Sequence, residues 1–541
     1  MADRLEADVV IVGAGIAGTL IAWQLATAGV SVLVLEAGPW VDRAKAVERY
    51  RAAVAKVPEA PYEDLPYAPR PTVIDLEAYY QQDGPDFFKS TYERRVGGST
   101  WHWQGTMIRF VPNDFRMQSL FGVGIDWPIS YDDLEPWYLL AEQETGVAGD
   151  EFDDDPSPRS GSFPMAAIPA SVADQQIAAA VGPIGLSVRT NPQAKNSEVF
   201  DGRPPCCGNN ICVPICPIAA KYDASVHAIK AQDAGARIEA DAVAYNLEVD
   251  NEGNVTRVQF KRPDGSEHEA VGRVFVLAAH AIETPKLLLL STSEATPNGV
   301  ANSSDTVGRH LMDHPTQVSL CLSKDPVWPY RAPVETSGIE TYRDGGFRSD
   351  WGAFRTPIGN DGWSFGGAIP VDYAGTLVRE QGLRGQALRD ALREQTMRQV
   401  RLAALVEQLP DPENRVRVAD DARDAIGIPH PRITYRVDEY SLRGMEQARM
   451  MADQVFDAIG ATFREHVEFF YGAGHIMGTH RMGTDPQTSV TDSFGRTHDH
   501  PNLFLAGSGL FPTSGTANPT LTLAALALRT GDLIRSELGK S

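Results

Sequence analysis

The sequence is poor in cysteine and has no long apolar run, and each absence excludes a class of protein. Only five of its 541 residues are cysteine, too few for a fold built on disulfide bonds. No apolar stretch reaches the length of a membrane-spanning helix, and there is no internal repeat or low-complexity tract. With 43% hydrophobic and 22% charged residues, the composition is that of a soluble globular protein.

Basic residues are also scarce relative to acidic ones. The chain has 49 Lys and Arg against 71 Asp and Glu, a net charge of −22. Such a surface repels nucleic acid and anionic membranes and favours basic protein partners. A chain of this length exceeds one ordinary hydrophobic core, so we expect two domains.

The N-terminal stretch lacks the features of an export signal. Asp8 and three spaced glycines interrupt its apolar residues, which favours a strand and a helix over a signal peptide. There is no twin-arginine signal either. From its own sequence, the protein is expected to stay in the cytoplasm.

The same stretch is typical of a dinucleotide-binding unit. Residues 9–12 form an apolar run without alternation, as in a parallel strand buried on both faces. Gly13, Gly15 and Gly18 follow with the spacing G-x-G-x-x-G, which permits a tight turn, the approach of a pyrophosphate and close helix packing. Glu36 ends the next strand and could accept hydrogen bonds from both hydroxyls of an adenosine ribose. A glycine turn without a ligand would leave this glutamate unexplained.

A second glycine-rich segment, residues 95–105, carries paired glycines, hydroxyl side chains and aromatic residues. Gly97, Gly98 and Ser99 suit a backbone that lies against a flat ring or a phosphate. His102 stands between two tryptophans, which add stacking surface to a titratable group. These three side chains could instead belong to the core, but the glycine pair favours contact with a cofactor.

Four of the five cysteines lie within eleven residues; they are Cys206, Cys207, Cys212 and Cys216. Prolines and small residues separate them and the run ends in Cys-Pro, which is typical of iron–sulfur ligands. Zinc would prefer two C-x-x-C pairs or histidines, and a disulfide between adjacent cysteines is strained. Iron–sulfur ligation is the favoured interpretation, with zinc and a disulfide as alternatives. Cys321, between two leucines, is expected to be an inert core residue.

Further elements are expected along the chain. The apolar run 272–279 predicts a buried strand, followed by a helix that Thr284 caps and that has Pro285 at its first position. A polar, histidine-rich turn follows at 307–315, and the arginine-rich segment 379–401 predicts a solvated helix. Near the C-terminus a strand ends in a glycine-rich turn and an apolar helix follows, so the chain returns to the sheet in which it began.

Together these segments resemble the glucose–methanol–choline oxidoreductase family. The resemblance covers essentially the whole chain and rests on GAGIAG with Glu36, GGST, AAHAIETPKLLLLS and the C-terminal HIMGT and NPT segments. It implies an α/β fold: a Rossmann-like FAD-binding domain with a second, α+β substrate-binding domain over the isoalloxazine. We expect the FAD-binding domain to comprise residues 1–120, 200–316 and 486–541, and the substrate domain residues 121–199 and 317–485.

The resemblance also implies roles for individual residues. His475 matches the family's catalytic histidine and Asn518 its histidine or asparagine partner. Contacts with FAD are implied at Gly13, Gly15, Gly18, Glu36, Gly97, Gly98, Ser99, His102, Val243 and Gly509. The implied reaction is oxidation of a sugar or polyol hydroxyl, in which His475 takes the hydroxyl proton and a hydride passes to flavin N5. Neutral imidazole suits this role because its ordinary pKa lies near the working pH.

Within the family, the cysteine segment 203–220 resembles that of large catalytic subunits of bacterial sugar dehydrogenases, which carry a [3Fe-4S] cluster beside FAD. The family's Cys-x5-Cys-x3-Cys spacing implies Cys206, Cys212 and Cys216 as ligands. Adjacent residues of an extended chain point to opposite sides, so only one of Cys206 and Cys207 is expected to face inward. If all four cysteines were ligands, the cluster would be a [4Fe-4S] cluster.

Those dehydrogenases act on glucose, fructose, sorbitol or gluconate and pass electrons to a cytochrome or quinone partner. They are usually accompanied by a small twin-arginine-exported subunit and a multihaem cytochrome c. The resemblance therefore implies the periplasmic face of the inner membrane, reached only through the partners, with the cytoplasm as the alternative.

Other interpretations stay open on the sequence alone. A gluconate, other sugar-acid or glucoside dehydrogenase of the same family is one, and an oxidase that passes electrons to oxygen is another. The cysteine segment argues against the oxidase, because one-electron relays serve a protein acceptor. A non-catalytic flavin-binding or escort protein would have no use for His475 and Asn518. Separately, His102 lies about where some family members attach flavin covalently, so a covalent link is a further hypothesis.

Overall fold

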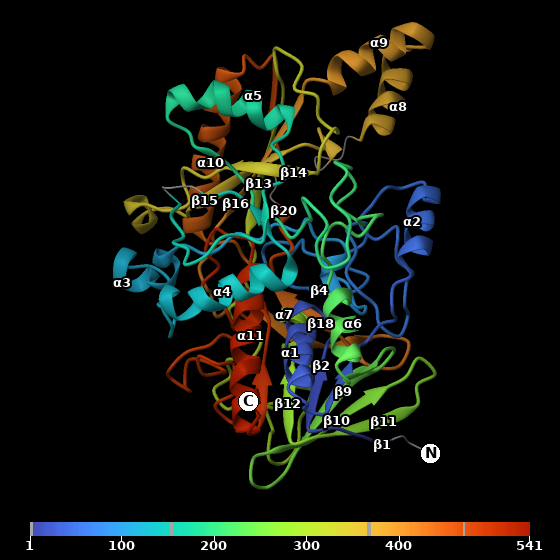
Figure 1. Ribbon diagram of the computed structural model, residues 1–541, viewed down its shortest axis with the longest axis vertical. Coiled ribbons are helices and arrows are strands. Elements are labelled where there is room, and N and C mark those ends of the chain that lie inside the picture. The colour runs from blue at the N-terminus through green and yellow to red at the C-terminus, as the bar shows by residue number, and fades with distance from the viewer. Residues whose placement is uncertain (1–3, 152–154, 365–368, 469–470, 541) are drawn as a thin grey trace.

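The computed structural model describes residues 4–151, 155–364, 369–468 and 471–540. The molecule is elongated, with a Rossmann-like parallel sheet towards one end and an antiparallel sheet towards the other (Figure 1). The expected α/β fold with two sheet-based parts is therefore confirmed.

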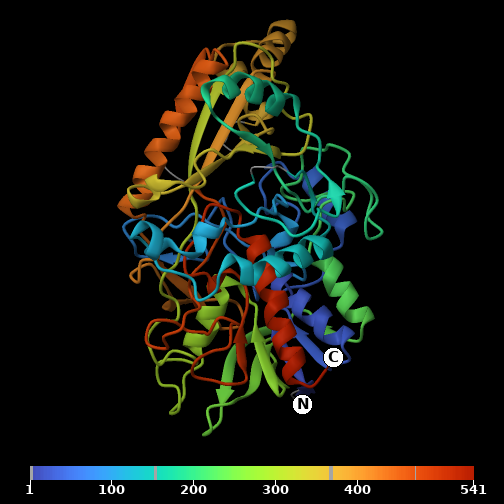
Figure 2. The same cartoon turned by 60° about the vertical axis from the view of Figure 1, so that its left-hand side comes forward.

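The parallel sheet contains the glycine-rich N-terminal unit. Its strands, in spatial order, are β21 (Leu503–Leu505), β12 (Val274–Leu277), β2 (Val9–Val12), β3 (Val32–Leu35) and β8 (Arg237–Glu239). Every residue of β2 and β3 is buried, which explains the apolar runs without alternation. Helix α1 (Ile16–Thr27) packs against α11 (Thr520–Glu537) and α6 (Ser225–Asp233), so both ends of the chain meet beside this sheet (Figure 2).

A smaller sheet adjoins the parallel one, and helix α7 (His280–Leu290) follows β12. The smaller sheet has the order β1 (Arg4–Glu6), β11 (Glu267–Val271), β10 (Val255–Lys261) and β9 (Val243–Val249). Because α7 begins at His280, the prediction that Thr284 caps the helix is wrong and Pro285 lies inside it. Proline lacks the N–H that would bond the carbonyl four residues earlier. That carbonyl, of Ala281, instead accepts a hydrogen bond from the Thr479 hydroxyl at 2.6 Å.

The antiparallel sheet forms the other half of the molecule. Its strands, in order, are β19 (Phe463–His466), β13 (Pro315–Leu322), β16 (Gln399–Val406), β15 (Phe354–Gly359), β14 (Glu335–Ile339) and β7 (Val188–Thr190), with β20 (Tyr471–Gly472) also paired to β13. Alternate residues of β16, from Val400 to Val406, pack with α10 (Glu439–Ala458) and α5 (Val172–Val181). The residues between them, Arg401, Ala403 and Leu405, line a cavity. One face of this sheet is therefore covered by helices and the other faces the cavity.

Two short helices project from this half (Figure 1). They are α8 (Pro370–Glu380) and α9 (Gly385–Thr396), and no residue of α9 is buried. The single helix predicted over 379–401 is therefore wrong at both ends, since it spans two helices and the start of β16. Arg401 is buried because its charge is paired with Asp361, with 2.8 Å between Nε and Oδ1.

The remaining elements connect the two halves. They are α2 (Arg43–Ala52), α3 (Met117–Phe121), α4 (Tyr131–Thr145), the pair β5 (Ala148–Gly149) and β6 (Met165–Ala166), and the sheet of β17 (Arg415–Arg423), β18 (Pro429–Thr434) and β4 (Gln81–Gln82). The last sheet joins chain from both sides of the predicted domain boundary, and the domain limits stay a prediction. Within the described ranges, no helix combines the length and apolar character needed to cross a membrane.

Candidate active site

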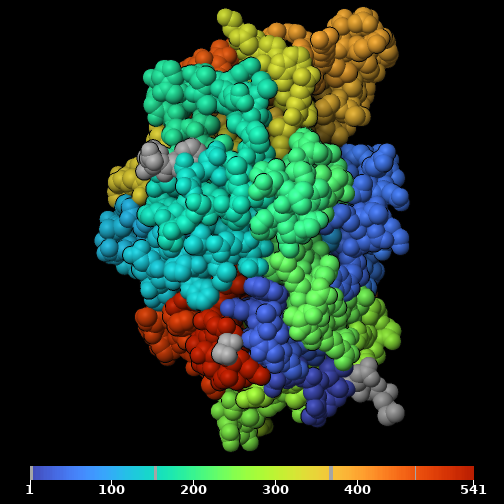
Figure 3. Space-filling model, in the orientation of Figure 1, coloured from blue at the N-terminus to red at the C-terminus, as the bar shows by residue number. Residues whose placement is uncertain are grey.

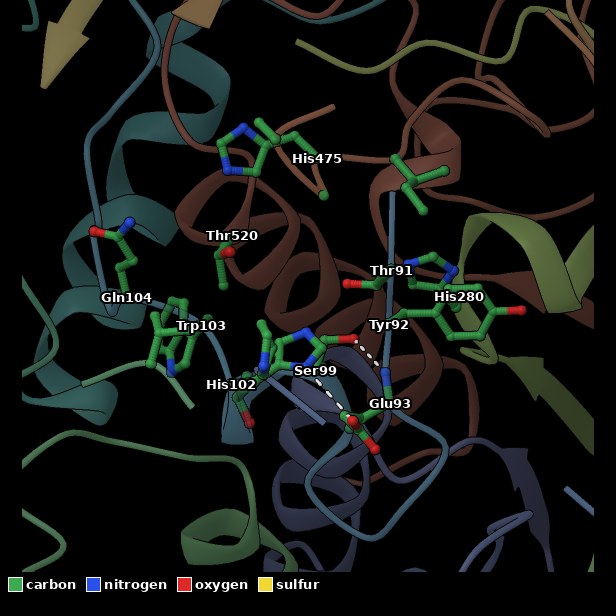
Figure 4. A pocket seen from close by; sticks show the side chains of 18 of the residues that line it. Thr91, Tyr92, Glu93, Ser99, His102, Trp103, Gln104, His280, His475 and Thr520 are labelled. Atoms are coloured by element: carbon green, nitrogen blue, oxygen red, sulfur yellow. Dashed lines mark hydrogen bonds and ion pairs between the residues drawn. The ribbon is translucent and has the colours of Figure 1, made fainter. Parts of the chain in front are cut away.

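A cavity of about 1050 Å³ lies between the parallel and antiparallel sheets and is lined from both. Eight of the predicted site residues line it, namely Gly13, Gly15, Glu36, Gly98, Ser99, His102, His475 and Asn518. Figure 4 shows His475 on the far side of the hollow from His102 and Ser99, with Thr520 between them in this view. The cavity thus brings together segments from the beginning and the end of the chain.

The N-terminal glycines form a cradle beside this cavity. Gly13 has φ of +102°, and a Cβ there would lie 2.5 Å from the Ala278 oxygen. A Cβ at Gly18 would lie 2.0 Å from the Gly13 oxygen, so this glycine permits close packing of α1. A Cβ at Gly15 would meet no atom of the described residues within 4 Å. The open space at Gly15, next to the positive end of α1, fits a pyrophosphate.

Glu36 directly follows β3, which ends one residue earlier than predicted, and lines the cavity. Its Oε2 accepts a hydrogen bond from the Ala14 N–H at 2.8 Å and its Oε1 one from the Gly38 N–H at 3.1 Å. Burial raises the pKa of Glu36, against the lowering effect of these bonds. Each carboxylate oxygen has a further lone pair, so ribose hydroxyls can still bind. The residues present therefore fit FAD.

The segment with paired glycines lies against the cradle. Gly97 donates its N–H to the Ala14 oxygen at 2.8 Å, and Ser99 Oγ accepts the Glu93 N–H at 3.1 Å. His102 Nδ1 lies 3.6 Å from Glu93 Oε1 (Figure 4). Covalent attachment of flavin at His102 stays a hypothesis, which acid precipitation tests: a coloured pellet supports it and a yellow supernatant over a colourless pellet contradicts it.

Four predicted cofactor contacts do not line the cavity. Gly18 and Gly97 lie behind its wall, where they permit the close packing of neighbouring segments. Val243 is a core residue with 1% of its surface exposed. A Cβ at Gly509 would lie 1.9 Å from Cε1 of His480, so this glycine makes room for that ring. Residues next to Val243 and Gly509 in the chain line the cavity instead, and both assignments stay predictions.

The proposed catalytic pair is close together. Asn518 precedes α11 and its Nδ2 lies 3.1 Å from His475 Nε2. His475 follows β20, and its backbone N–H donates to Asp313 Oδ1 at 2.9 Å. Burial, with smaller effects of His314 and Arg355, holds the pKa of His475 well below its usual range. His475 is therefore neutral at working pH and can accept a proton.

The structure adds three residues to this pair that the sequence did not single out. His314 Nδ1 lies 2.8 Å from His475 Nδ1, and Arg355 Nη1 lies 3.4 Å from Asn518 Oδ1. Asp313 is buried, and burial raises its pKa to about 6. In the sequence, only the polar turn at 307–315 pointed to Asp313 and His314, and no feature pointed to Arg355.

The antiparallel sheet contributes charged side chains to the opposite wall. Glu335 begins β14, Arg401 lies on β16 and Asp361 follows β15, and all three line the cavity. Arg401 lies 2.8 Å from Asp361 and 3.5 Å from Glu335. Because these ion pairs fix the three side chains, the wall presents preorganised donors and acceptors to a ligand.

The cysteine segment forms a second, much smaller cavity. Cys206, Cys207, Cys212 and Cys216 all line it. None of the five cysteines, all of which are described, forms a disulfide. Cys207 is exposed and Cys206 half-buried, and because both line this cavity, the choice between them stays a prediction. Within the described residues, no group of three or more His, Cys, Asp and Glu side chains is arranged to hold a metal ion. The cluster therefore stays a prediction.

Two buried lysines line the same small cavity. Burial opposes ionisation of Cys212, but Lys195 and Lys221 outweigh it and the pKa of this thiol is lowered. Burial also lowers the pKa of Lys221 to about 7. Thiolates are the ligands that iron prefers, so the chemistry of the segment suits a cluster even though its thiols are not gathered as a ligand set.

Comparison with known proteins adds independent findings. Residues 410–527 match the family described as GMC oxidoreductase, and residues 8–68 match that described as FAD dependent oxidoreductase. The chain is 43% identical over 545 residues to the fructose dehydrogenase large subunit of Gluconobacter japonicus, covering 99% of both chains. It is 28% identical to a 2-methyl-1,2-propanediol dehydrogenase of Mycolicibacterium austroafricanum, covering 98% of this chain and 95% of the relative.

A solved structure is similar over the whole fold. A variant of formate oxidase from Aspergillus oryzae superposes with a TM-score of 0.66 at 16% identity, covering 99% of each chain. At this identity the likeness concerns the fold alone.

Proposed function

The chain belongs to the GMC oxidoreductase family of FAD-dependent enzymes, and we propose that it is a dehydrogenase that oxidises a hydroxyl group of a sugar or polyol. The observation that carries this proposal is the pair His475 and Asn518, 3.1 Å apart, on the wall of the cavity that also contains the glycine cradle. The name of the relative from Gluconobacter japonicus, a fructose dehydrogenase large subunit, supports a sugar as the substrate.

His475 would act as the base and Asn518 as its partner. The Asn518 amide donates to His475 Nε2, so this nitrogen carries a lone pair. A substrate hydroxyl that takes the place of the Asn518 amide at Nε2 would give its proton to this nitrogen, while Asn518 donates to the hydroxyl oxygen and stabilises its developing negative charge. FAD, when bound, supplies the acceptor for the hydride of the carbinol carbon.

The charged wall favours a substrate with many hydroxyl groups. Carboxylates of Glu335 and Asp361 accept hydrogen bonds and the Arg401 guanidinium donates them. Two carboxylates beside Arg401 compensate its charge, which disfavours an acidic substrate such as gluconate. A neutral sugar or polyol is therefore preferred over the sugar-acid alternative.

The proposal is tested on purified enzyme under anaerobic conditions. Fructose and related sugars should bleach the flavin absorbance of the wild type. The His475→Ala enzyme should keep its FAD but lose about 10²- to 10⁴-fold in turnover, and wild-type turnover in that variant would contradict the assignment. Peroxide formed in step with substrate loss would indicate an oxidase, and no bleaching by any alcohol would indicate a flavin-binding protein without this activity.

We also propose that Cys206, Cys212 and Cys216 hold a [3Fe-4S] cluster. The shared small cavity and the two buried lysines, which lower the pKa of the Cys212 thiol, support the assignment, whereas burial raises the pKa of Cys206. Electron paramagnetic resonance of single Cys→Ser variants tests it. Loss of the oxidised-cluster signal on substitution of each of these three, with Cys207→Ser unchanged, is the expected result. Loss in Cys207→Ser with Cys206→Ser unchanged would reverse the choice, and loss in all four would indicate a [4Fe-4S] cluster.

Electrons would then leave to a cytochrome or quinone partner. We propose a small twin-arginine-exported subunit and a multihaem cytochrome c as partners, which would locate the enzyme at the periplasmic face of the inner membrane. The cysteine segment belongs to the green region of Figure 3, which lies at the molecular surface and is accessible to a partner. Genes for both proteins beside this one, and their co-purification with it, would support the assignment; purification of an active enzyme alone from the cytoplasm would contradict it.

A further inference from the structure

A line of hydrogen bonds runs through the catalytic pair. Arg355 Nη1 lies 3.4 Å from Asn518 Oδ1, and Asn518 Nδ2 lies 3.1 Å from His475 Nε2. On its other side, His475 Nδ1 lies 2.8 Å from His314 Nδ1. His314 Nε2 lies 2.9 Å from the backbone oxygen of Gly515. The line begins at a side chain of β15 and ends at the loop before α11.

Each end of this line of hydrogen bonds has a fixed role, one as a donor and the other as an acceptor. A guanidinium only donates and a backbone carbonyl only accepts. Asn518 therefore turns its oxygen to Arg355 and its amide nitrogen to His475. At the other end, His314 carries its proton on Nε2 and offers the lone pair of Nδ1. Between these fixed ends, a neutral His475 has one place for its proton, which is Nδ1.

We propose that His314 is a positioning residue that holds the proton of His475 on Nδ1 and so keeps on Nε2 the lone pair that takes the proton of the substrate. The inference rests on the proposed function, because it requires His475 to be the base. With its proton on Nε2, His475 would face the Asn518 amide donor to donor and could not accept a hydroxyl proton. His314 thus acts through His475 and need not touch the substrate.

The surroundings of His314 keep it in the required state. The ring is fully buried, and burial lowers its pKa to about 4, so it is neutral at working pH and retains a lone pair on Nδ1. The backbone N–H groups of His314 and His475 both donate to Asp313 Oδ1, at 2.6 and 2.9 Å. The Asp313 carboxylate thus fixes the position of the segment with His314 relative to the segment with His475.

A matched pair of variants tests the proposal. Asparagine and leucine have similar shape, but only His314→Asn keeps an oxygen that can accept the His475 proton. We expect His314→Leu to lower kcat about 10- to 100-fold with little change in KM and with FAD retained, and His314→Asn to keep most of the wild-type kcat. His498→Gln, which removes an imidazole hydrogen-bonded to Ser489, serves as the control. Equal losses in the two His314 variants, or no loss in either, would overturn the proposal.

A third variant covers the case in which His314→Leu does not fold. In His314→Asp, a carboxylate accepts the Nδ1 proton and stabilises the imidazolium of His475, whose other charged neighbours are Arg355 and Asp313. The acidic limb of kcat/KM against pH should therefore move to higher pH, and an unmoved limb in an active variant would overturn the proposal. Normal turnover by His475→Ala would contradict the proposed function itself. An inactive His475→Ala together with indistinguishable His314 variants would remove only the inference about His314.

Discussion

Replacement of Asn518 by aspartate would invert the hydrogen bond to His475 without changing the size of the side chain. An ionised carboxylate only accepts hydrogen bonds, so His475 Nε2, 3.1 Å from the present amide nitrogen, would carry a proton. The base would then present an N–H to the substrate. The hydroxyl proton would lose its acceptor on His475, and turnover should fall.

The size of the effect follows from the geometry. At 3.1 Å and an effective dielectric constant of about 20, a carboxylate and an imidazolium attract by about 5 kcal/mol. Arg355, 3.4 Å from the same side chain, offsets part of this. We therefore expect the pKa of His475, which burial now holds low, to rise. Loss of the donor to the developing alkoxide adds about 10²- to 10³-fold in kcat.

The assay is kcat and kcat/KM against pH for enzymes matched in FAD content, with Asn518→Ala as the control that removes the donor without inverting the bond. Asn518→Asp should lose at least as much activity as Asn518→Ala and should not recover at alkaline pH. A charged carboxylate is a stronger acceptor than the neutral His314 Nδ1, so it keeps the proton on Nε2 even of a neutral ring. Recovery to the level of Asn518→Ala above the raised pKa would show that only the pKa had changed. Wild-type kcat in Asn518→Asp would refute the reasoning.

Other predictions concern the cradle and the buried charges. Gly15→Val should fold with an unchanged circular dichroism spectrum but retain no FAD, and FAD bound at the wild-type level would contradict the assignment of the cradle to the pyrophosphate. Gly18→Ala should lose stability, because its Cβ would lie 2.0 Å from a backbone oxygen. Arg348→Met should cost about 3–5 kcal/mol, measured by thermal denaturation, because Asp114 and Glu407, at 2.7 and 2.6 Å, lose their buried partner. Burial already raises the pKa of Asp114 against the lowering effect of Arg348. Without the arginine this pKa rises further, so stability falls more steeply as pH rises and the deficit should be smaller at about pH 5 than at about pH 8; equal deficits would count against this.

Features set by local sequence were predicted well. The buried strand β2, the glycine turn after it and the glutamate that follows β3 lie where the spacing indicated. Cys321 is a buried core residue, as its leucine neighbours implied. In each case the signal lies within a few residues, since a strand's burial or a turn's φ depends mostly on its own side chains.

Features set by contacts between distant segments could not be predicted. His314 and His475 are 161 residues apart, and nothing in either segment indicates the other. Arg401 was assigned to a solvated helix because an arginine in a polar segment is usually exposed. The sequence does not indicate that Asp361 pairs with it inside the protein. Pro285 indicated the start of a helix, but it lies inside α7. The Thr479 hydroxyl donates to the Ala281 oxygen in place of the N–H that proline lacks. Partners of buried polar groups come from the fold, and a single sequence does not name them.

The cysteine segment separates the two cavities, and this bears on how electrons would leave the site. Ile211 lines both cavities, and Lys221 Nζ donates to the backbone oxygens of Trp101, Trp103 and Cys212. The lysine thus ties the glycine-rich cofactor segment directly to the thiol-bearing one. Cys206, Cys212 and Cys216 would hold a redox group beside a segment that also lines the large cavity, and that group would supply one-electron transfer there. Loss of cluster signal without loss of flavin bleaching in the Cys212→Ser enzyme would therefore mean that hydride transfer does not require the cluster, which would then act only in the exit of electrons.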